Sequence, residues 1–209
     1  MEILKRGLVS ILFFALIGIN LESKAQTQVQ LEAAFSESYT AESSGEYSQG
    51  IIAIKKYYNA NSYEINIRLA WLNYLAGQYT ESVGYYSKCI SLMPLSIEPL
   101  LGLTYPAAAM GNWEQVINSY ERVLKLDKNN YTANLKLGQI YLSRMEYAKA
   151  EPFFKLLVNQ YPFTYDVLLS TAWNNYYLGK FREAKVLFNK VLLLNPGDSS
   201  ASDGLKNIQ

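Results

Sequence analysis

The sequence predicts an all-α fold made of about five antiparallel helix pairs, and three observations support this prediction. Small, aromatic and glycine residues recur in fixed columns with a period of 34 residues. Within each half of the period, apolar residues have the spacing of a helix face and not the alternation of a strand. Half of the 209 residues are hydrophobic, which is enough to form a core and argues against disorder.

The columns of the repeat explain how each pair is built. A turn column contains Gly77, Gly111 and Gly179, with Met145 as the exception. Two residues later comes an aromatic column, followed by a small-residue column and a buried column; in chain order they comprise Tyr79, Trp113, Tyr147 and Phe181, then Ser82, Val116, Ala150 and Ala184, then Cys89, Val123, Leu157 and Val191. Glycine permits a tight turn, small side chains allow close helix approach, and aromatic rings fill the space between neighbouring pairs.

These residues resemble the tetratricopeptide repeat, in which 34 residues form two antiparallel helices. The resemblance extends from about Leu31 to Asp198, and it implies a right-handed superhelical solenoid with a concave inner groove. We place the repeat domain at 26–198, with repeats near 29–62, 63–96, 97–130, 131–164 and 165–198. The helix pairs are expected near 30–58, 62–91, 96–125, 130–160 and 164–193. The first repeat is degenerate, because its turn at Gly45 lies 32 residues before Gly77.

The segment 199–209 is expected to form a short C-terminal cap or tail. Solenoids need an end cap with a polar outer side, and Ser199 or Ser200 is the expected cap of one short helical turn. So short a segment is expected to cover the last repeat poorly. This end of the stack is therefore predicted either to fray or to pack on a partner, including a second copy of the chain.

The first 25 residues have the pattern of a secretory signal peptide. Lys5 and Arg6 precede an apolar stretch over 8–19, and Ser23 and Ala25 supply small residues before the expected cleavage point. The apolar stretch is shorter than the roughly 18 to 20 residues that span a bilayer. We expect an exported chain, periplasmic or extracellular, without stable membrane insertion after cleavage. An uncleaved anchor is the alternative.

The resemblance also implies which residues face the groove. In this family the fifth, ninth, twelfth and thirteenth positions of each repeat usually point into it. The candidate partner-binding residues are Ile67, Trp71, Tyr74, Leu101, Tyr105, Leu135, Gln139, Leu169, Trp173, Tyr176 and Tyr177. The ninth position is usually polar in the family, whereas here it is aromatic in three of four repeats. The lysine and asparagine set with which some members clamp a terminal carboxylate is absent.

Two interpretations of these aromatic residues stay open. Aromatic side chains bury large areas at little entropic cost, so they suit the binding of a protein or peptide segment. They also fill seams between stacked helices, and the chain is rich in tyrosine throughout. A glycan-binding module that stacks sugar rings on Trp71, Tyr105 and Trp173 is an alternative, as is a self-associating scaffold subunit.

Composition argues against several other functions. The chain has 19 basic and 18 acidic residues, so no basic excess is available for nucleic acid. It has no histidine, the commonest general base and metal ligand. The sequence shows no paired catalytic groups and no phosphate-binding glycine loop. We therefore expect a bacterial envelope interaction module that is not an enzyme and has no cofactor and no metal. Cys89 is expected to be buried as a small apolar residue.

Overall fold

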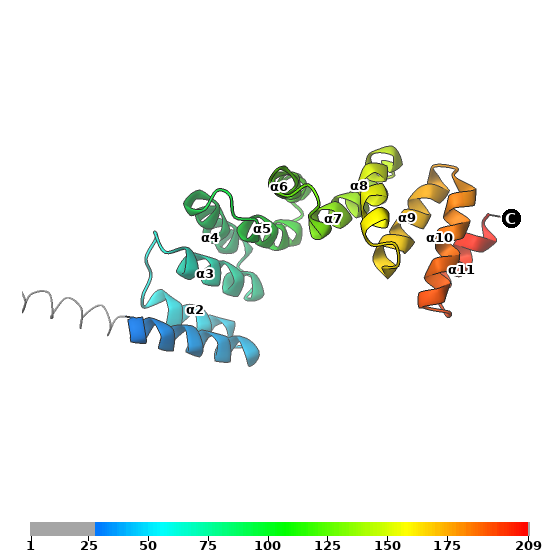
Figure 1. Cartoon of the computed structure of the whole chain (residues 1–209). Helices are drawn as coiled ribbons and strands as arrows, with labels where there is room; N and C mark the ends of the chain where they lie inside the picture. The colour runs from blue at the N-terminus through cyan, green and yellow to red at the C-terminus, as the bar shows by residue number, and fades with distance from the viewer. Residues whose placement is uncertain (1–27, 209) are drawn as a thin grey trace, which may run out of the picture. The chain divides into compact units, whose positions relative to one another are not determined.

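The computed structural model describes residues 28–208, and every regular element in that range is an α-helix (Figure 1). The predicted signal peptide, residues 1–25, lies outside the described residues. A first helix covers residues 28–43, and the others follow in chain order: α2 Tyr47–Lys55, α3 Tyr63–Leu75, α4 Tyr79–Leu92, α5 Glu98–Ala109, α6 Trp113–Leu126, α7 Tyr131–Ser143, α8 Tyr147–Gln160, α9 Tyr165–Tyr177, α10 Phe181–Leu194 and α11 Ser199–Lys206. The expected helix pairs agree with these bounds to within a few residues.

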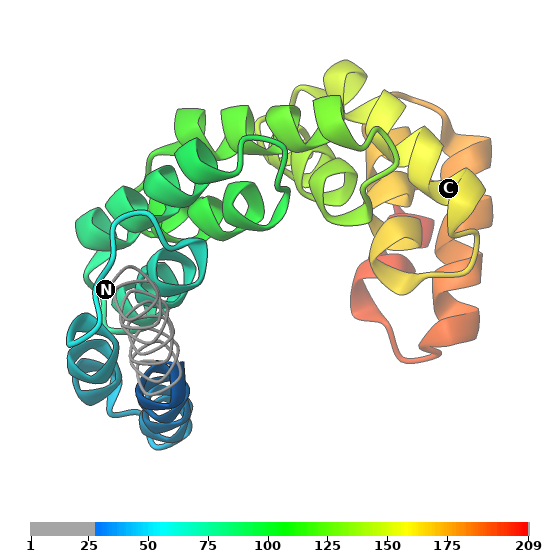
Figure 2. The ribbon, with the colours of Figure 1, turned by 60° about the vertical axis from the view of Figure 1, so that its left-hand side comes forward.

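The chain divides into two compact units. The N-terminal unit ends at Pro94 and includes the helix 28–43 and α2 to α4, and the C-terminal unit starts at Leu95 and contains α5 to α11. Within each unit, consecutive helices pack side by side as antiparallel pairs (Figure 2). The predicted all-α architecture of helix pairs is confirmed.

A left-handed backbone conformation makes the turn inside each pair. Gly45, Gly77, Gly111 and Gly179 have φ angles between 71° and 75°, and Met145 has the same conformation at 61°. An L-residue with a side chain adopts this region only at a cost, which explains why four of the five positions are glycine. The degenerate first repeat therefore keeps the turn of the others.

Several helices begin at a side-chain cap. Ser62, Asn112 and Asn130 each accept a hydrogen bond from the backbone N–H three residues later, at the starts of α3, α6 and α7. These bonds satisfy amide groups that the first turn of a helix leaves without a partner. At α11 the cap is Asp198, whose carboxylate accepts from Ala201 N at 2.8 Å. The expected cap at Ser199 or Ser200 was therefore wrong by one or two residues.

The core of the C-terminal unit is built on phenylalanines packed against glycines. Phe154 and Phe188 are almost completely buried, at 1% and 0% exposure. A Cβ added to Gly138 would lie 2.6 Å from the Phe154 ring, and one added to Gly204 would lie 2.3 Å from the Phe188 ring. The rings thus occupy space that any other residue at these two positions would need. The predicted buried column is confirmed, because Cys89, Val123, Leu157 and Val191 all have no exposed surface.

The last repeat is covered better than expected. Ala201 of α11 is fully buried in the same core cluster as Phe188, with Leu205 packed against it. Tyr165 hydrogen-bonds to Asp198, and Trp173 Nε1 donates to Ser200 Oγ at 2.9 Å. The hydrogen bond from the Tyr165 hydroxyl is the largest cause that lowers the pKa of Asp198, and hydrogen bonds from the Ala201 backbone and the Asn195 side chain lower it further. The expectation of a poor cap was therefore wrong, since Gly204 lets α11 approach Phe188 closely.

A buried arginine ties α3 to the helix 28–43 in the N-terminal unit. Arg68 is 5% exposed, forms an ion pair with Glu42 and donates from Nε to Ser38 Oγ at 2.9 Å. Its guanidinium lies 3.9 Å from the centroid of the Tyr39 ring. A charge at this depth is tolerated because it is paired and hydrogen-bonded.

The same carboxylate also accepts a hydrogen bond from an indole. Trp71 Nε1 donates to Glu42 Oε1 at 2.7 Å. Partial burial raises the pKa of Glu42, but the hydrogen bonds from Trp71 and Arg68 and the arginine charge outweigh it, so the pKa falls below its ordinary value of 4.5. This carboxylate is therefore more stable as an anion when the chain is folded.

Replacing Glu42 by glutamine is expected to destabilise the N-terminal unit at neutral pH. The change leaves the Arg68 charge without its partner, and because Glu42 is partly exposed the loss should be at most about 3 kcal/mol. The pKa of Glu42 is lowered by folding, so its contribution is present above pH 4.5 and disappears as the pH falls through the folded-state value. Denaturant unfolding of both proteins at a series of pH values measures this.

Glu37→Gln is the control for that comparison, because Glu37 is exposed on the same helix. Its effect should be small at every pH. A Glu42→Gln difference that stays constant down to the acid limit would contradict the assigned role of this carboxylate.

Replacing Met145 by glycine is expected to stabilise the C-terminal unit by about 1 kcal/mol, because it removes a side chain from a left-handed conformation. Met145 is 75% exposed, so little packing is lost. Met110→Gly is the control, since Met110 has a negative φ of −84° one residue before a turn glycine. That variant should be neutral or less stable. Thermal denaturation that gives both variants the same sign of change would refute the explanation.

Truncation of Phe154 to alanine is expected to cost about 3 to 5 kcal/mol, because the ring is fully buried and leaves a cavity. Tyr57→Ala in the degenerate repeat should cost less, since Tyr57 is only partly buried at the edge of its core cluster. Chemical denaturation compares the two. Equal losses would show that the first repeat is packed as firmly as the fourth.

Candidate partner-binding site

Five aromatic side chains form a connected group in the C-terminal unit, which we call the aromatic cluster. Its members are Tyr147 of α8, Trp173, Tyr176 and Tyr177 of α9, and Phe181 of α10. Tyr177 is at its centre: it stacks on Tyr147 with a centroid distance of 4.7 Å and on Trp173 with a distance of 5.8 Å. Tyr176 lies 5.5 Å from Trp173 and 5.6 Å from Phe181.

Helix geometry brings these residues together. Trp173, Tyr176 and Tyr177 have the i, i+3, i+4 spacing that places side chains on one face of α9. Tyr147 and Phe181 each stand at the first position of a second helix, two residues after the left-handed turn residue. Each turn thus delivers an aromatic ring to the end of α9.

The cluster combines a fixed base with an exposed rim. Trp173 is half-buried, with its ring edge-on to Phe188 at 5.0 Å and its indole N–H bonded to Ser200. Tyr177 and Phe181 are 49% and 48% exposed. Rings held by packing at one side and open at the other offer apolar area to a partner with little side-chain entropy left to lose.

A smaller aromatic group occupies the corresponding place in the N-terminal unit. Trp71 lies 5.5 Å from Tyr74, and Tyr74 lies 6.0 Å from Tyr79 at the start of α4. Trp71 is half-buried and bonded to Glu42, much as Trp173 is bonded to Ser200. Leu75 stands where the C-terminal unit has Tyr177, so this group has no equivalent of the central ring.

The remaining predicted groove residues have different environments. Ile67, Leu101 and Leu169 are half-buried, and Tyr105 is 52% exposed on α5. Gln139 is half-buried and donates to Ser170 Oγ at 3.4 Å, which joins α7 to α9.

The prediction that Leu135 lines the groove was wrong. It is only 6% exposed and belongs to the core cluster of Ala150 and Phe154, so it packs inside the unit instead of lining a groove. The predicted row of candidates also falls in two separate units, with Ile67, Trp71 and Tyr74 in the first.

Sequence reasoning did not select Tyr147 and Phe181 as binding residues. Both belong to the aromatic column of the repeat, whose members are predicted only to fill the space between helix pairs. The distinguishing signal is the thirteenth position of the next repeat, which is Tyr177 after Tyr147 and Ser143 after Trp113. Only the former can stack a ring on the aromatic column.

Residues 28–208 lack the features of two other kinds of site. That range contains no group of three or more histidine, cysteine, aspartate or glutamate side chains arranged to hold a metal ion. None of its helices has the length and apolar character needed to cross a membrane.

Comparison with known proteins gives one match to a protein family and several matches to solved structures. Residues 107–167 match the Tetratricopeptide repeat family. No curated protein matches the chain in sequence.

Several solved structures share the fold. A tetratricopeptide repeat protein from Parabacteroides merdae ATCC 43184 is 19% identical, with a TM-score of 0.73 over 86% of this chain and 72% of its own. A structure of MamA protein is 21% identical, with a TM-score of 0.67 over 78% of this chain and 90% of its own. MamA from Desulfovibrio magneticus RS-1 is 17% identical, with a TM-score of 0.64 over 70% and 82%.

These structural similarities confirm the predicted fold class, an all-α solenoid of the tetratricopeptide type. The family match over residues 107–167 and the shared fold together support a tetratricopeptide repeat protein.

Proposed function

We propose that this chain is a non-catalytic protein-interaction module that holds an apolar peptide segment of a partner protein on the aromatic cluster. The tetratricopeptide fold suggests a protein–protein interaction scaffold. The fold names no ligand, so only the residues of this surface indicate what it binds.

The observation that carries the proposal is the half-exposure of Tyr177 and Phe181 above a fixed aromatic base. Single exposed rings occur elsewhere in the described residues, Phe163 among them, but these two keep about half of their surface open within one connected group of rings. Binding energy at protein interfaces concentrates on aromatic anchors in places that a partner fully desolvates. A peptide with apolar or aromatic side chains complements such a surface.

The composition of the cluster suits an uncharged partner segment. The cluster itself contains no ionisable acid or base other than tyrosine hydroxyls. Electrostatic steering of a strongly charged partner, nucleic acid included, is not favoured by a surface of this kind.

We propose that the module acts after export, in the periplasm or outside the cell. This part rests on the leader sequence over residues 1–25, with its basic start, apolar stretch and small residues before Ala25. The mature chain is then residues 26–209, and it interacts with proteins of the bacterial envelope.

A glycan is a second candidate ligand, because the open ring faces of Tyr177 and Phe181 also suit stacking on sugars. Self-association is a third candidate, since a second copy of the chain can supply apolar side chains to the same rings. Both are outcomes that the experiment below separates from the binding of a peptide.

Peptides selected by the mature chain from a random displayed library are expected to carry apolar or aromatic residues and to bind the aromatic cluster. Replacing both Tyr177 and Phe181 by alanine should weaken binding of a selected peptide by about ten- to a hundredfold, because two anchors are lost. Fluorescence anisotropy of the labelled peptide gives the affinity. Tryptophan fluorescence with oligosaccharides, and sedimentation of the free chain, test the two alternatives.

The matched control is Tyr161→Ala with Phe163→Ala, which also removes one tyrosine and one phenylalanine that are exposed in the same unit but outside the cluster. This control should bind normally. Equal affinity for the wild type and the Tyr177, Phe181 double variant, with both folded by circular dichroism, would remove the cluster as the binding site.

A further inference from the structure

The aromatic cluster carries hydroxyl groups that no other described part of the chain uses. The hydroxyls of Tyr147, Tyr176 and Tyr177 have no hydrogen-bond partner among residues 28–208. Those of Tyr147 and Tyr176 are not enclosed, although both residues are half-buried, and Tyr177 is 49% exposed. The indole N–H of Trp173, in contrast, already donates to Ser200. The cluster therefore offers three phenolic hydroxyls to a partner.

These hydroxyls favour a partner that brings hydrogen-bond acceptors. A tyrosine hydroxyl has one hydrogen to donate and also carries lone pairs. It donates more strongly than it accepts, because the aromatic ring withdraws electron density from the oxygen. A partner segment with free carbonyl oxygens beside apolar groups therefore matches both the hydroxyls and the rings of the cluster.

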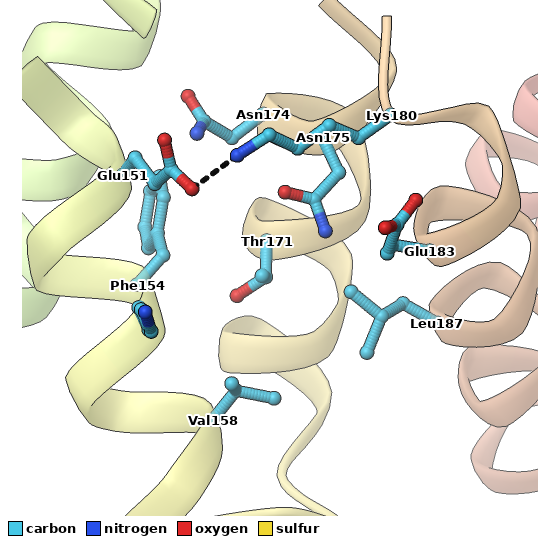
Figure 3. Close-up of a pocket in the computed structure, with 10 residues that line it drawn as sticks. Glu151, Phe154, Val158, Thr171, Asn174, Asn175, Lys180, Glu183 and Leu187 are labelled. Atoms are coloured by element: carbon cyan, nitrogen blue, oxygen red, sulfur yellow. Dashed lines mark hydrogen bonds and ion pairs between the residues drawn. The ribbon is translucent and has the colours of Figure 1, made fainter. Parts of the chain in front are cut away.

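The charges next to the cluster give a charged segment little to pair with. Glu146 and Lys180 directly precede Tyr147 and Phe181, and each forms an ion pair with a side chain of α8 (Figure 3). Arg182 follows Phe181, but successive residues of a helix lie about 100° apart around its axis, so the two side chains leave α10 in different directions. The partner segment is therefore recognised by its backbone and its apolar groups.

The backbone conformation of the bound segment follows from where its carbonyl oxygens are engaged. A bound strand needs an exposed sheet edge, and the range 28–208 has helices as its only regular elements. A bound helix already uses its carbonyls in its own hydrogen bonds. A polyproline II helix has no internal hydrogen bonds, so its carbonyls stay free, and proline has no backbone N–H that would need an acceptor. Of the three, this conformation complements a surface of donors and rings.

Proline rings also suit the rigid part of the cluster. Tyr177 is held by stacking on Tyr147 and on Trp173. A polyproline II segment is extended before it binds, so neither the segment nor the rings lose much conformational freedom in the complex. Aromatic-lined surfaces bind proline-rich segments in other folds for the same reason.

The smaller aromatic group of the N-terminal unit lacks this combination. The Glu42 carboxylate accepts from the Trp71 indole, so a negative charge and an acceptor lie beside the rings. Leu75 stands where the C-terminal unit has Tyr177, so the central hydroxyl is missing. Only the C-terminal unit therefore carries the full surface for a segment of this kind.

We propose that the partner segment held by the aromatic cluster is proline-rich and binds as a polyproline II helix. Its carbonyl oxygens accept hydrogen bonds from the tyrosine hydroxyls, and its proline rings pack against Tyr177 and Phe181. This inference rests on the proposed function, because it names the kind of peptide that the same surface binds.

The test uses labelled decaproline and the mature chain, with fluorescence anisotropy as the measurement. L-decaproline should bind saturably, and the all-D peptide, which forms the mirror-image helix, should bind at least about tenfold more weakly. Replacing Tyr147, Tyr176 and Tyr177 by phenylalanine removes the three hydroxyls and keeps the rings. This triple variant should lose at least about tenfold in affinity for L-decaproline, because each lost hydrogen bond costs a factor of about two to ten.

The matched control replaces Tyr131, Tyr141 and Tyr161 by phenylalanine. These tyrosines belong to the same unit, lie outside the cluster, and their hydroxyls likewise have no hydrogen-bond partner among the described residues. The control should bind L-decaproline as the wild type does. The inference is overturned if L-decaproline shows no saturable binding below about 1 mM, if the D peptide binds equally, or if the triple cluster variant binds unchanged.

The displayed library separates this inference from the proposed function. Proline-rich sequences among the peptides that bind the cluster would support both. Selected peptides that lose affinity with the Tyr177, Phe181 double variant but contain no proline would leave the proposed function standing and refute the polyproline II segment.

Discussion

The left-handed turn inside each helix pair is the constraint on which the rest of this structure depends. A φ of 61° to 75° at one residue reverses the chain and sets the second helix against the first. Because the turn is the same in all five pairs, residues at a fixed distance from it reach equivalent places. The rings of Tyr147 and Phe181 meet the end of α9 for this reason. Met145 shows how strong the constraint is, since the backbone keeps this conformation even with a side chain present.

The period of the sequence was sufficient to predict the helices, their pairing and the buried column that ends in Val191, since each feature recurs and can be checked against its copies. Features that occur once could not be predicted in the same way. The Arg68–Glu42 pair joins α3 to the degenerate first repeat, where no column offers a comparison. The close packing of α11 depends on the missing Cβ of Gly204, which looked like a residue of a polar tail.

Only part of the candidate site could be predicted from positions in the repeat. Trp173, Tyr176 and Tyr177 follow from the positions that usually face the groove, but those positions do not reveal how deep a side chain lies. Leu135 fits the same pattern and is buried in the core cluster of Ala150 and Phe154. The depth of a side chain depends on what packs against it from neighbouring helices, which its position in the repeat does not reveal.

The two faces of the C-terminal unit are joined by bonds of different physical kinds. Gln139 of α7 and Ser170 of α9 form a neutral hydrogen bond. Lys180, the residue before α10, and Glu151 of α8 form an ion pair whose side chains are 39% and 37% exposed. Dissolved ions screen exposed charges and leave neutral hydrogen bonds almost unaffected. Raising the salt concentration therefore weakens the Lys180–Glu151 contact and leaves the Gln139–Ser170 hydrogen bond almost unchanged.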